Sequence, residues 1–136
     1  MRIAIVSATA KQNGIPGYIR ALQKGMESMG HRVDVVDAWT EDGYKLPGYE
    51  YLAVVAEQIS LFGGKMPESL LKIVATSGGG IGGKRSAAFL KKTYPFTSKG
   101  LSNLMKLMEK EGMLVNWSEV LLNDSHAEAM GKRIGV

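Results

Sequence analysis

The sequence predicts a three-layer α/β protein, in which helices cover both faces of a doubly wound sheet of five parallel strands. Three observations support this prediction. Apolar runs of strand length alternate with amphipathic helical patterns along the chain. The runs at 3–6 and 51–56 show no polar alternation, which is typical of strands buried on both faces of a parallel sheet. At the start of the chain, a strand is followed by a polar loop and a helix, which is how a βαβ unit begins. The crossover connections of such units are right-handed. The number of units favours the strand order 2-1-3-4-5, in a single domain over residues 1–136.

The first unit begins with the strand at 3–6. A helix follows, because apolar residues recur at spacings of three and four and form one stripe: Ile15, Ile19, Leu22, Met26 and Met29. Gly30 is suited to end this helix. The range 32–39 is predicted as the second strand, nearer an edge, because it alternates in part. Turn signals in the range 40–49 indicate that the next crossover helix is missing or reduced.

The remaining units follow the same order. The strand at 51–56 is expected in the centre of the sheet, and a helix opens near Pro67. The buried side of that helix is predicted from its apolar residues: Leu70, Leu71, Ile73 and Val74. The glycine-rich range 77–83 is a loop, and 85–90 is the fourth strand.

The last part of the chain predicts a helix, a strand and a short final helix. Thr97 or Ser98 is suited to cap the helix, whose apolar stripe reads Leu101, Leu104, Met105 and Met108. The fifth strand covers 113–122. Ser125 and Glu128 have the spacing of a capping box, so they are expected to open the final helix.

Composition excludes several classes of function. The chain has no cysteine, and its two histidines lie far apart, so thiolate chemistry and a zinc site are not expected. No run is long enough to span a membrane and no signal peptide is recognisable, so we expect a cytoplasmic protein. The net charge of +4 is too small to argue for nucleic-acid binding. No set of side chains indicates acid–base or nucleophilic catalysis.

Three loops are expected to meet in the ligand crevice at the carboxyl ends of the strands: 7–14, 58–65 and 93–98. In the first loop, Ser7, Thr9 and Asn13 can donate hydrogen bonds to phosphate oxygens, and Lys11 can add positive charge. The alternative is an ordinary polar loop whose hydroxyls cap the helix that follows.

The other two crevice loops carry aromatic side chains. Phe62, followed by Gly63, can stack on a flat ring that the glycine backbone approaches closely. Tyr94 and Phe96 give a second pair in the next loop. The alternative for Phe62 is that it covers the end of the core, and Trp39 is interpreted as a packing residue.

The loop at 77–83 matches two nucleotide-binding patterns only as strings. Gly78, Gly80 and Gly83 fit a dinucleotide fingerprint, and Gly83-Lys84 fits part of a P-loop. Both motifs need a strand before the loop and a helix after it, and here the order is reversed. We therefore interpret the loop as a connector. A receiver domain is also excluded, because Glu57 is the only carboxylate at the ends of the first and third strands.

Taken together, the chain resembles the flavodoxin-like family, which includes flavodoxins and flavin-dependent NAD(P)H oxidoreductases. The most specific resemblance lies in three segments, residues 3–9, 61–67 and 93–99. It implies that Ser7, Thr9 and Asn13 hold the phosphate of FMN. It also implies that Phe62 and Gly63 border the flavin ring on one side and Tyr94 and Phe96 on the other.

The first functional hypothesis is an FMN-binding redox protein, active in electron transfer or in NAD(P)H-linked reduction of a flavin or quinone. Its partner would be a redox protein or a small electron acceptor, and the resemblance allows a homodimer. The alternative is a binding or structural module that kept the fold and lost the flavin. It is favoured by the first loop, where Ala10 follows Thr9 at the position of the family's usual glycine. A third hypothesis is that the chain binds an anionic partner through its basic surface.

Overall fold

The computed structural model describes residues 1–134, and in it five strands form one parallel sheet in the order β2-β1-β3-β4-β5. The strands are β1 (Arg2–Ala8), β2 (Arg32–Asp37), β3 (Tyr51–Ala56), β4 (Arg85–Lys91) and β5 (Leu114–Leu121). The helices are α1 (Gly17–Ser28), α2 (Glu68–Ala75), α3 (Ser98–Lys110) and α4 (Asp124–Gly131). The predicted fold class and strand order are confirmed.

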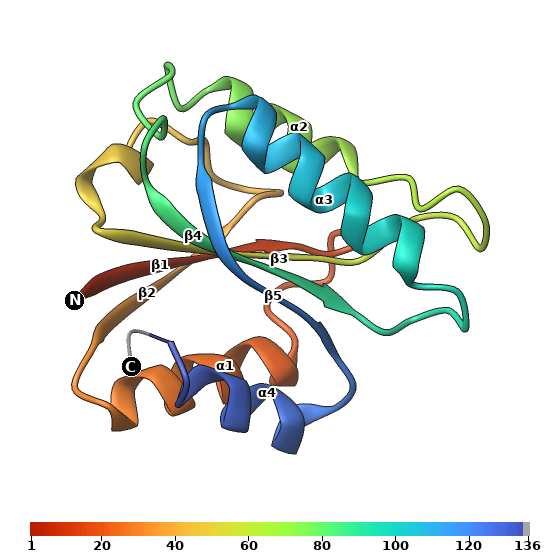
Figure 1. Cartoon of the computed structure of the whole chain (residues 1–136), viewed down its shortest axis with the longest axis horizontal. Coiled ribbons are helices and arrows are strands. Elements are labelled where there is room, and N and C mark those ends of the chain that lie inside the picture. Colours follow the sequence, from red (N-terminus) through yellow and green to blue (C-terminus); the bar gives the residue numbers. More distant parts are fainter. Residues whose placement is uncertain (135–136) are drawn as a thin grey trace.

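The helices cover both faces of the sheet (Figure 1): α1 and α4 pack on one face, and α2 and α3 on the other. Because successive strand residues point to opposite faces, β1 supplies both cores. Ile3 and Ile5 join the core under α1 and α4, whereas Ala4 and Val6 join the core under α2 and α3. All four are fully or almost fully buried. The continuous apolar run in the sequence is therefore explained by two cores rather than one.

Two glycines allow α1 and α4 to touch through their backbones. A side chain at Gly25 would collide with the carbonyl oxygen of Glu128, and one at Gly131 would collide with that of Leu22. A Cβ atom at either position would also lie 3.1 Å from the Cα atom of the other glycine. The sequence patterns did not indicate this contact, which requires a glycine, without a side chain, at both Gly25 and Gly131.

The connection from β2 to β3 contains only a 3₁₀ turn, Leu46–Gly48. The expected reduction of this crossover helix is confirmed. Leu46 and Tyr49 are buried in the core under α2 and α3, so this short segment fills space that a helix would fill. Gly43 lies against the backbone of α2, where a side chain would collide with the carbonyl oxygen of Ile73.

The predicted apolar stripes are wrong at two residues, Met29 and Leu71. Helix α1 is flanked by Pro16 and Met29, so Ile15 and Met29 lie outside it; Ile15 still packs against the core under α1 and α4, whereas Met29 is 48% exposed. Leu71 is 51% exposed, while its neighbour Leu70 is fully buried. Successive residues of a helix are turned by about 100°, so Leu71 points away from the face that Leu70 buries.

The predicted capping box at Ser125 is also wrong. Helix α4 is capped by Asn123, whose Oδ1 accepts a hydrogen bond of 2.9 Å from the backbone N–H of His126. Asparagine at this position satisfies the N–H three residues on, so the N-cap stands two residues before the expected one. Thr97 stands at the N-cap position of α3, as expected, but its side chain makes no capping hydrogen bond.

Within residues 1–134, no helix is both long enough and apolar enough to cross a lipid bilayer.

Candidate functional site

The carboxyl ends of β1, β3 and β4 lie at one edge of the sheet, at the right of Figure 1. The loops that follow them cover residues 9–16, 57–67 and 92–97. The first loop and the other two differ in how many of their polar groups are already bonded within the protein.

Internal hydrogen bonds close the loop after β1. Thr9 is 5% exposed, and its hydroxyl donates a hydrogen bond of 2.6 Å to the carbonyl oxygen of Lys11. The indole N–H of Trp39 lies 2.9 Å from the carbonyl oxygen of Thr9 and 3.1 Å from its hydroxyl oxygen. Trp39 therefore holds the loop through its indole N–H, a role that its interpretation as a packing residue did not include.

The four residues predicted to bind phosphate are divided between the interior and the surface. Ser7 and Thr9 are buried, whereas Lys11 and Asn13 are exposed. The Ser7 hydroxyl has no hydrogen-bond partner among residues 1–134. The structure does not gather these four side chains around one accessible point, and phosphate binding by them stays a prediction.

A carboxylate that the analysis of the sequence did not select lies against this loop. Glu57 directly follows β3, and its Oε1 accepts a hydrogen bond of 2.9 Å from the backbone N–H of Ala10. Its Oε2 accepts one of 2.7 Å from the hydroxyl of Tyr18, in α1. Burial, this hydrogen bond and the negative charge of Glu57 together raise the pKa of Tyr18. A carboxylate at the end of a fully apolar strand was the available signal.

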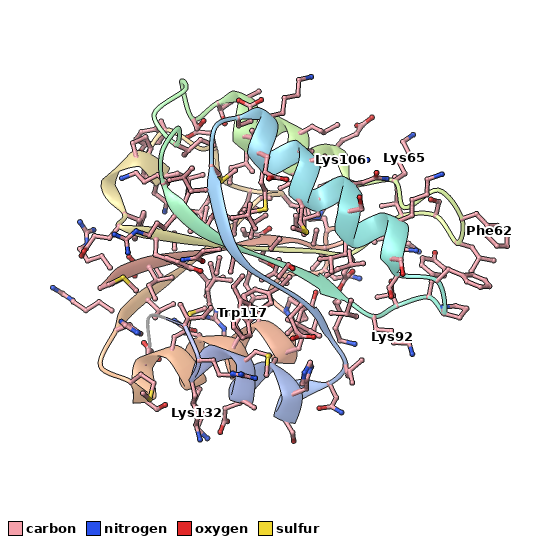
Figure 2. All side chains as sticks on the ribbon, viewed as in Figure 1. Phe62, Lys65, Lys92, Lys106, Trp117 and Lys132 are labelled. Carbon is pink, nitrogen blue, oxygen red and sulfur yellow. The ribbon has the colours of Figure 1, made fainter. Side chains whose placement is uncertain are left out.

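The two loops after β3 and β4 carry an exposed aromatic pair. The rings of Phe62 and Phe96 stack with centroids 5.4 Å apart and an angle of 27° between their planes. They are 70% and 59% exposed, so the alternative that Phe62 covers the end of the core is wrong. Tyr94 is half-buried and does not join the stack. Figure 2 shows Phe62 at the tip of its loop, at the same end of the molecule as Lys65 and Lys92.

A buried amide connects the two aromatic loops. The Gln58 side chain is 1% exposed, and its Nε2 donates to the carbonyl oxygens of Ser60, at 2.9 Å, and Phe96, at 3.0 Å. Asn103, in α3, donates to the carbonyl oxygens of Gly63, at 2.9 Å, and Gly64, at 3.1 Å. These residues were also missed, although a polar residue beside a buried strand is a recognisable signal.

Two glycines shape the same loop. Gly63 and Gly64 have φ angles of +84° and +63°, which favour glycine. Gly64 lies against the backbone of Gly100, where a side chain would collide, and Gly63 faces open space. The loop is thus held against α3 at Gly64 while Gly63 stays accessible.

The glycine-rich loop at 77–83 lies between α2 and β4, at the amino ends of the strands. Ile81 is fully buried and anchors it in the core. The Lys84 ammonium donates to the carbonyl oxygens of Pro47, at 2.6 Å, and Tyr49, at 2.7 Å. The interpretation as a connector is confirmed, and the lysine of the apparent P-loop pattern serves to hold the crossover.

Among residues 1–134, no group of three or more histidine, aspartate or glutamate side chains is placed to hold a metal ion.

No protein-family model and no curated protein sequence matches this chain. In structure, the chain is similar to a flavodoxin from the domain Archaea, with a TM-score of 0.73 and 20% identity over 98% of this chain and 96% of that one. It is also similar to the Megasphaera elsdenii flavodoxin, with a TM-score of 0.75 and 12% identity over 96% of both chains. The chain is likewise similar to flavodoxin 1 from Bacillus cereus, with a TM-score of 0.72 and 13% identity over 96% of this chain and 95% of that one. The fold is therefore flavodoxin-like.

Proposed function

We propose that this chain is a flavodoxin-type redox protein that binds a flavin noncovalently, with the flavin ring at Phe62 and Phe96. The observation that supports the proposal is the exposed aromatic pair itself. Two large apolar side chains that water surrounds are costly for a small protein, and such a patch usually marks a binding surface. This pair lies at the carboxyl ends of parallel strands, where ligands of open α/β sheets bind.

The residues at this edge fit a flat aromatic ligand. Phe62 and Phe96 offer ring faces for stacking, and Gly63 presents backbone without a side chain. Gln58 and Asn103 hold the loops before any ligand arrives, which reduces the entropy lost on binding. A bound flavin would supply electron or hydride transfer at its ring, and the chain would orient that ring and shield one side of it.

The spacing of the pair defines what must move. A flat ring enters between two parallel rings only where they stand about 7 Å apart, twice the ~3.5 Å contact distance. The centroids of Phe62 and Phe96 are 5.4 Å apart. We therefore expect one phenyl ring to rotate away on binding, which costs little because both side chains are exposed.

The sequence predicts FMN as the cofactor, and FMN shares its ring with riboflavin, so the aromatic loops by themselves suit both molecules. Electrons would pass from the bound flavin to a redox partner protein or to a small acceptor. The proposal includes NAD(P)H-linked reduction of a flavin or quinone. The exposed Lys65 and Lys92 lie at the same end of the molecule as Phe62 (Figure 2). Their charge favours a negatively charged partner at this end.

A flavin titration tests the proposal. We expect saturable quenching of flavin fluorescence and a shift of its absorbance when the purified protein is added to riboflavin or FMN. Phe62→Ala should weaken binding roughly tenfold. Leu71→Ala is the matched control, because Leu71 is also an exposed apolar residue but lies on α2. A folded protein that binds neither flavin would contradict the proposal.

One observation favours the second candidate, a module that kept the fold without a flavin. The Glu57 carboxylate already bonds to a backbone N–H of the loop after β1. For such a module, the exposed aromatic pair would bind a protein instead. The same titration distinguishes the two candidates, because only the redox protein binds a flavin ring.

A further inference from the structure

We propose that the loop after β1 carries its own anion, the Glu57 carboxylate, and that the crevice consequently selects a flavin without a phosphate, such as riboflavin, over FMN. The selection between flavins rests on the proposed function. The occupation of the loop by Glu57 does not, and it can be tested without any flavin.

The Glu57 carboxylate uses donors that an anion would need. Its two oxygens accept hydrogen bonds from the Ala10 N–H, at 2.9 Å, and from the Tyr18 hydroxyl, at 2.7 Å. Ala10 belongs to the loop between β1 and α1, and Tyr18 lies in the first turn of α1. A phosphate at this point would lose both donors and would stand beside a carboxylate. Like charges repel strongly where protein replaces part of the surrounding water.

A second carboxylate lies at the start of α1. Pro16 stands at the N-cap, where proline offers no N–H, and the N–H of Ile19 bonds to the Pro16 carbonyl oxygen at 3.1 Å. The Oδ2 of Asp124, in α4, lies 3.0 Å from the position that a Cβ atom would take at Gly17. The Asp124 carboxylate thus lies beside the first residue of α1, where the positive end of the helix dipole favours negative charge.

Positive charge near these carboxylates is limited. The Lys91 ammonium lies 5.4 Å from the centre of the Tyr18 ring, and Lys11 is exposed on the loop. The hydroxyls that could add donors are not accessible, because Ser7 and Thr9 are 1% and 5% exposed. The loop after β1 is therefore a poor site for a phosphate dianion.

The ring site does not depend on Glu57. The next residue, Gln58, donates to the Phe96 carbonyl oxygen and supports the aromatic loops, while Glu57 bonds to the loop after β1. Consecutive residues of an extended segment point in opposite directions, so one position serves each region. The crevice retains the parts that suit a flat ring and has replaced the part that suits a phosphate.

The first test compares riboflavin with FMN. We expect the wild-type protein to bind riboflavin at least as tightly as FMN in a fluorescence titration. Glu57→Gln keeps the shape of the side chain and removes its charge, so it should tighten FMN binding roughly tenfold and change riboflavin binding by less than about twofold. Glu50→Gln is the matched control, because Glu50 also accepts a backbone N–H bond, from Arg2, but lies at the other end of β3. It should change neither affinity.

The second test uses inorganic phosphate and amide NMR, so it needs no flavin. In the wild-type protein the amide signals of residues 10–15 and of Gly17 should not shift saturably with phosphate, whereas in the Glu57→Gln variant the Ala10 signal should. Saturable shifts in the wild-type protein would overturn the inference. Tighter binding of FMN than of riboflavin by about tenfold or more would do the same. If neither flavin binds, the proposed function fails, and the phosphate titration still decides the role of Glu57.

Discussion

Glu57 and Gln58 are neighbours in the sequence, yet they organise two regions of opposite character at the same edge of the sheet. Glu57 bonds to the loop after β1, in which Thr9 is nearly inaccessible and Trp39 completes the hydrogen bonding. Gln58 bonds to the loop after β4, where Phe96 stacks on Phe62 in solvent. In the first region Thr9, Ala10 and Trp39 bond internally, although the Ser7 hydroxyl has no partner among the described residues; the second region presents apolar surface outward.

The two regions show that one edge of a flavodoxin-like fold can hold a loop with internal hydrogen bonds beside loops with exposed aromatic rings. Stability and binding should therefore separate: changes in the first region should lower the free energy of unfolding, and changes at the aromatic tips should lower affinity for a flat ligand. A change at Gln58 should lower both the free energy of unfolding and the affinity, because Gln58 is buried and also positions the aromatic loops. The following predictions test this separation.

The largest effect is expected for Gln58→Ala. The change leaves the carbonyl oxygens of Ser60 and Phe96 without their donor and opens a cavity, so the free energy of unfolding should fall by about 2 kcal/mol. Riboflavin binding should weaken at least roughly tenfold, since the two loops lose their connection. Urea unfolding and a flavin titration measure the two effects. Gln23→Ala removes the hydrogen bond that Gln23 donates to the Val33 carbonyl oxygen and the one that it accepts from the Arg20 guanidinium; it is the control and should leave the affinity unchanged.

Glu57→Ala should sharpen the contrast by lowering stability without weakening riboflavin binding. It leaves the Ala10 N–H and the Tyr18 hydroxyl without their acceptor, which should cost about 1–2 kcal/mol in urea unfolding. Riboflavin affinity should stay within about twofold of the wild type. Glu50→Ala should cost less than about 0.5 kcal/mol, because Glu50 is exposed. Loss of riboflavin binding in Glu57→Ala would show that the two regions are not independent.

Trp39→Phe should have a smaller effect on the first region. Phenylalanine keeps most of the packing and removes the N–H that bonds to Thr9, so unfolding should become easier by about 1 kcal/mol. Trp117→Phe is the matched control, because the Trp117 indole N–H has no hydrogen-bond partner among the described residues. Equal destabilisation by the two changes would mean that packing, not the bond to Thr9, accounts for the effect.

The smallest effect is a pH dependence from Tyr18. Burial, the hydrogen bond to Glu57 and the negative charge of Glu57 raise its pKa, so the unfolded chain releases this proton first, near pH 10. The stability contributed by Tyr18 is complete below pH 10 and falls as the pH rises above it, by less than about 1 kcal/mol at pH 10.5. Tyr18→Phe should remove this part of the decline in urea unfolding between pH 9 and about 10.5. An unchanged decline would assign it to other groups, such as Tyr51, whose pKa burial raises to about 12.

Much of the architecture could be predicted from the sequence because its signals are local. Uninterrupted apolar runs at β1 and β3 indicated buried parallel strands, and turn residues after β2 indicated a crossover with little helix. The aromatic residues Phe62 and Phe96 were also placed correctly at the carboxyl ends of the strands, since a loop that follows a parallel strand must emerge at its carboxyl end. These features depend on residues close together in the chain.

The tertiary structure decided what depends on residues far apart. Glu57 reaches Ala10, 47 residues earlier, only because β1 and β3 are adjacent in the sheet. The contact of Gly25 with Gly131 appears only when α1 and α4 pack on the same face. Periodicity assigns a residue to a strand or a helix, but a carboxylate or a glycine has no period. Its role is set by the atoms that folding brings beside it: Glu57 lies against the loop after β1, and Gly25 lies against Gly131.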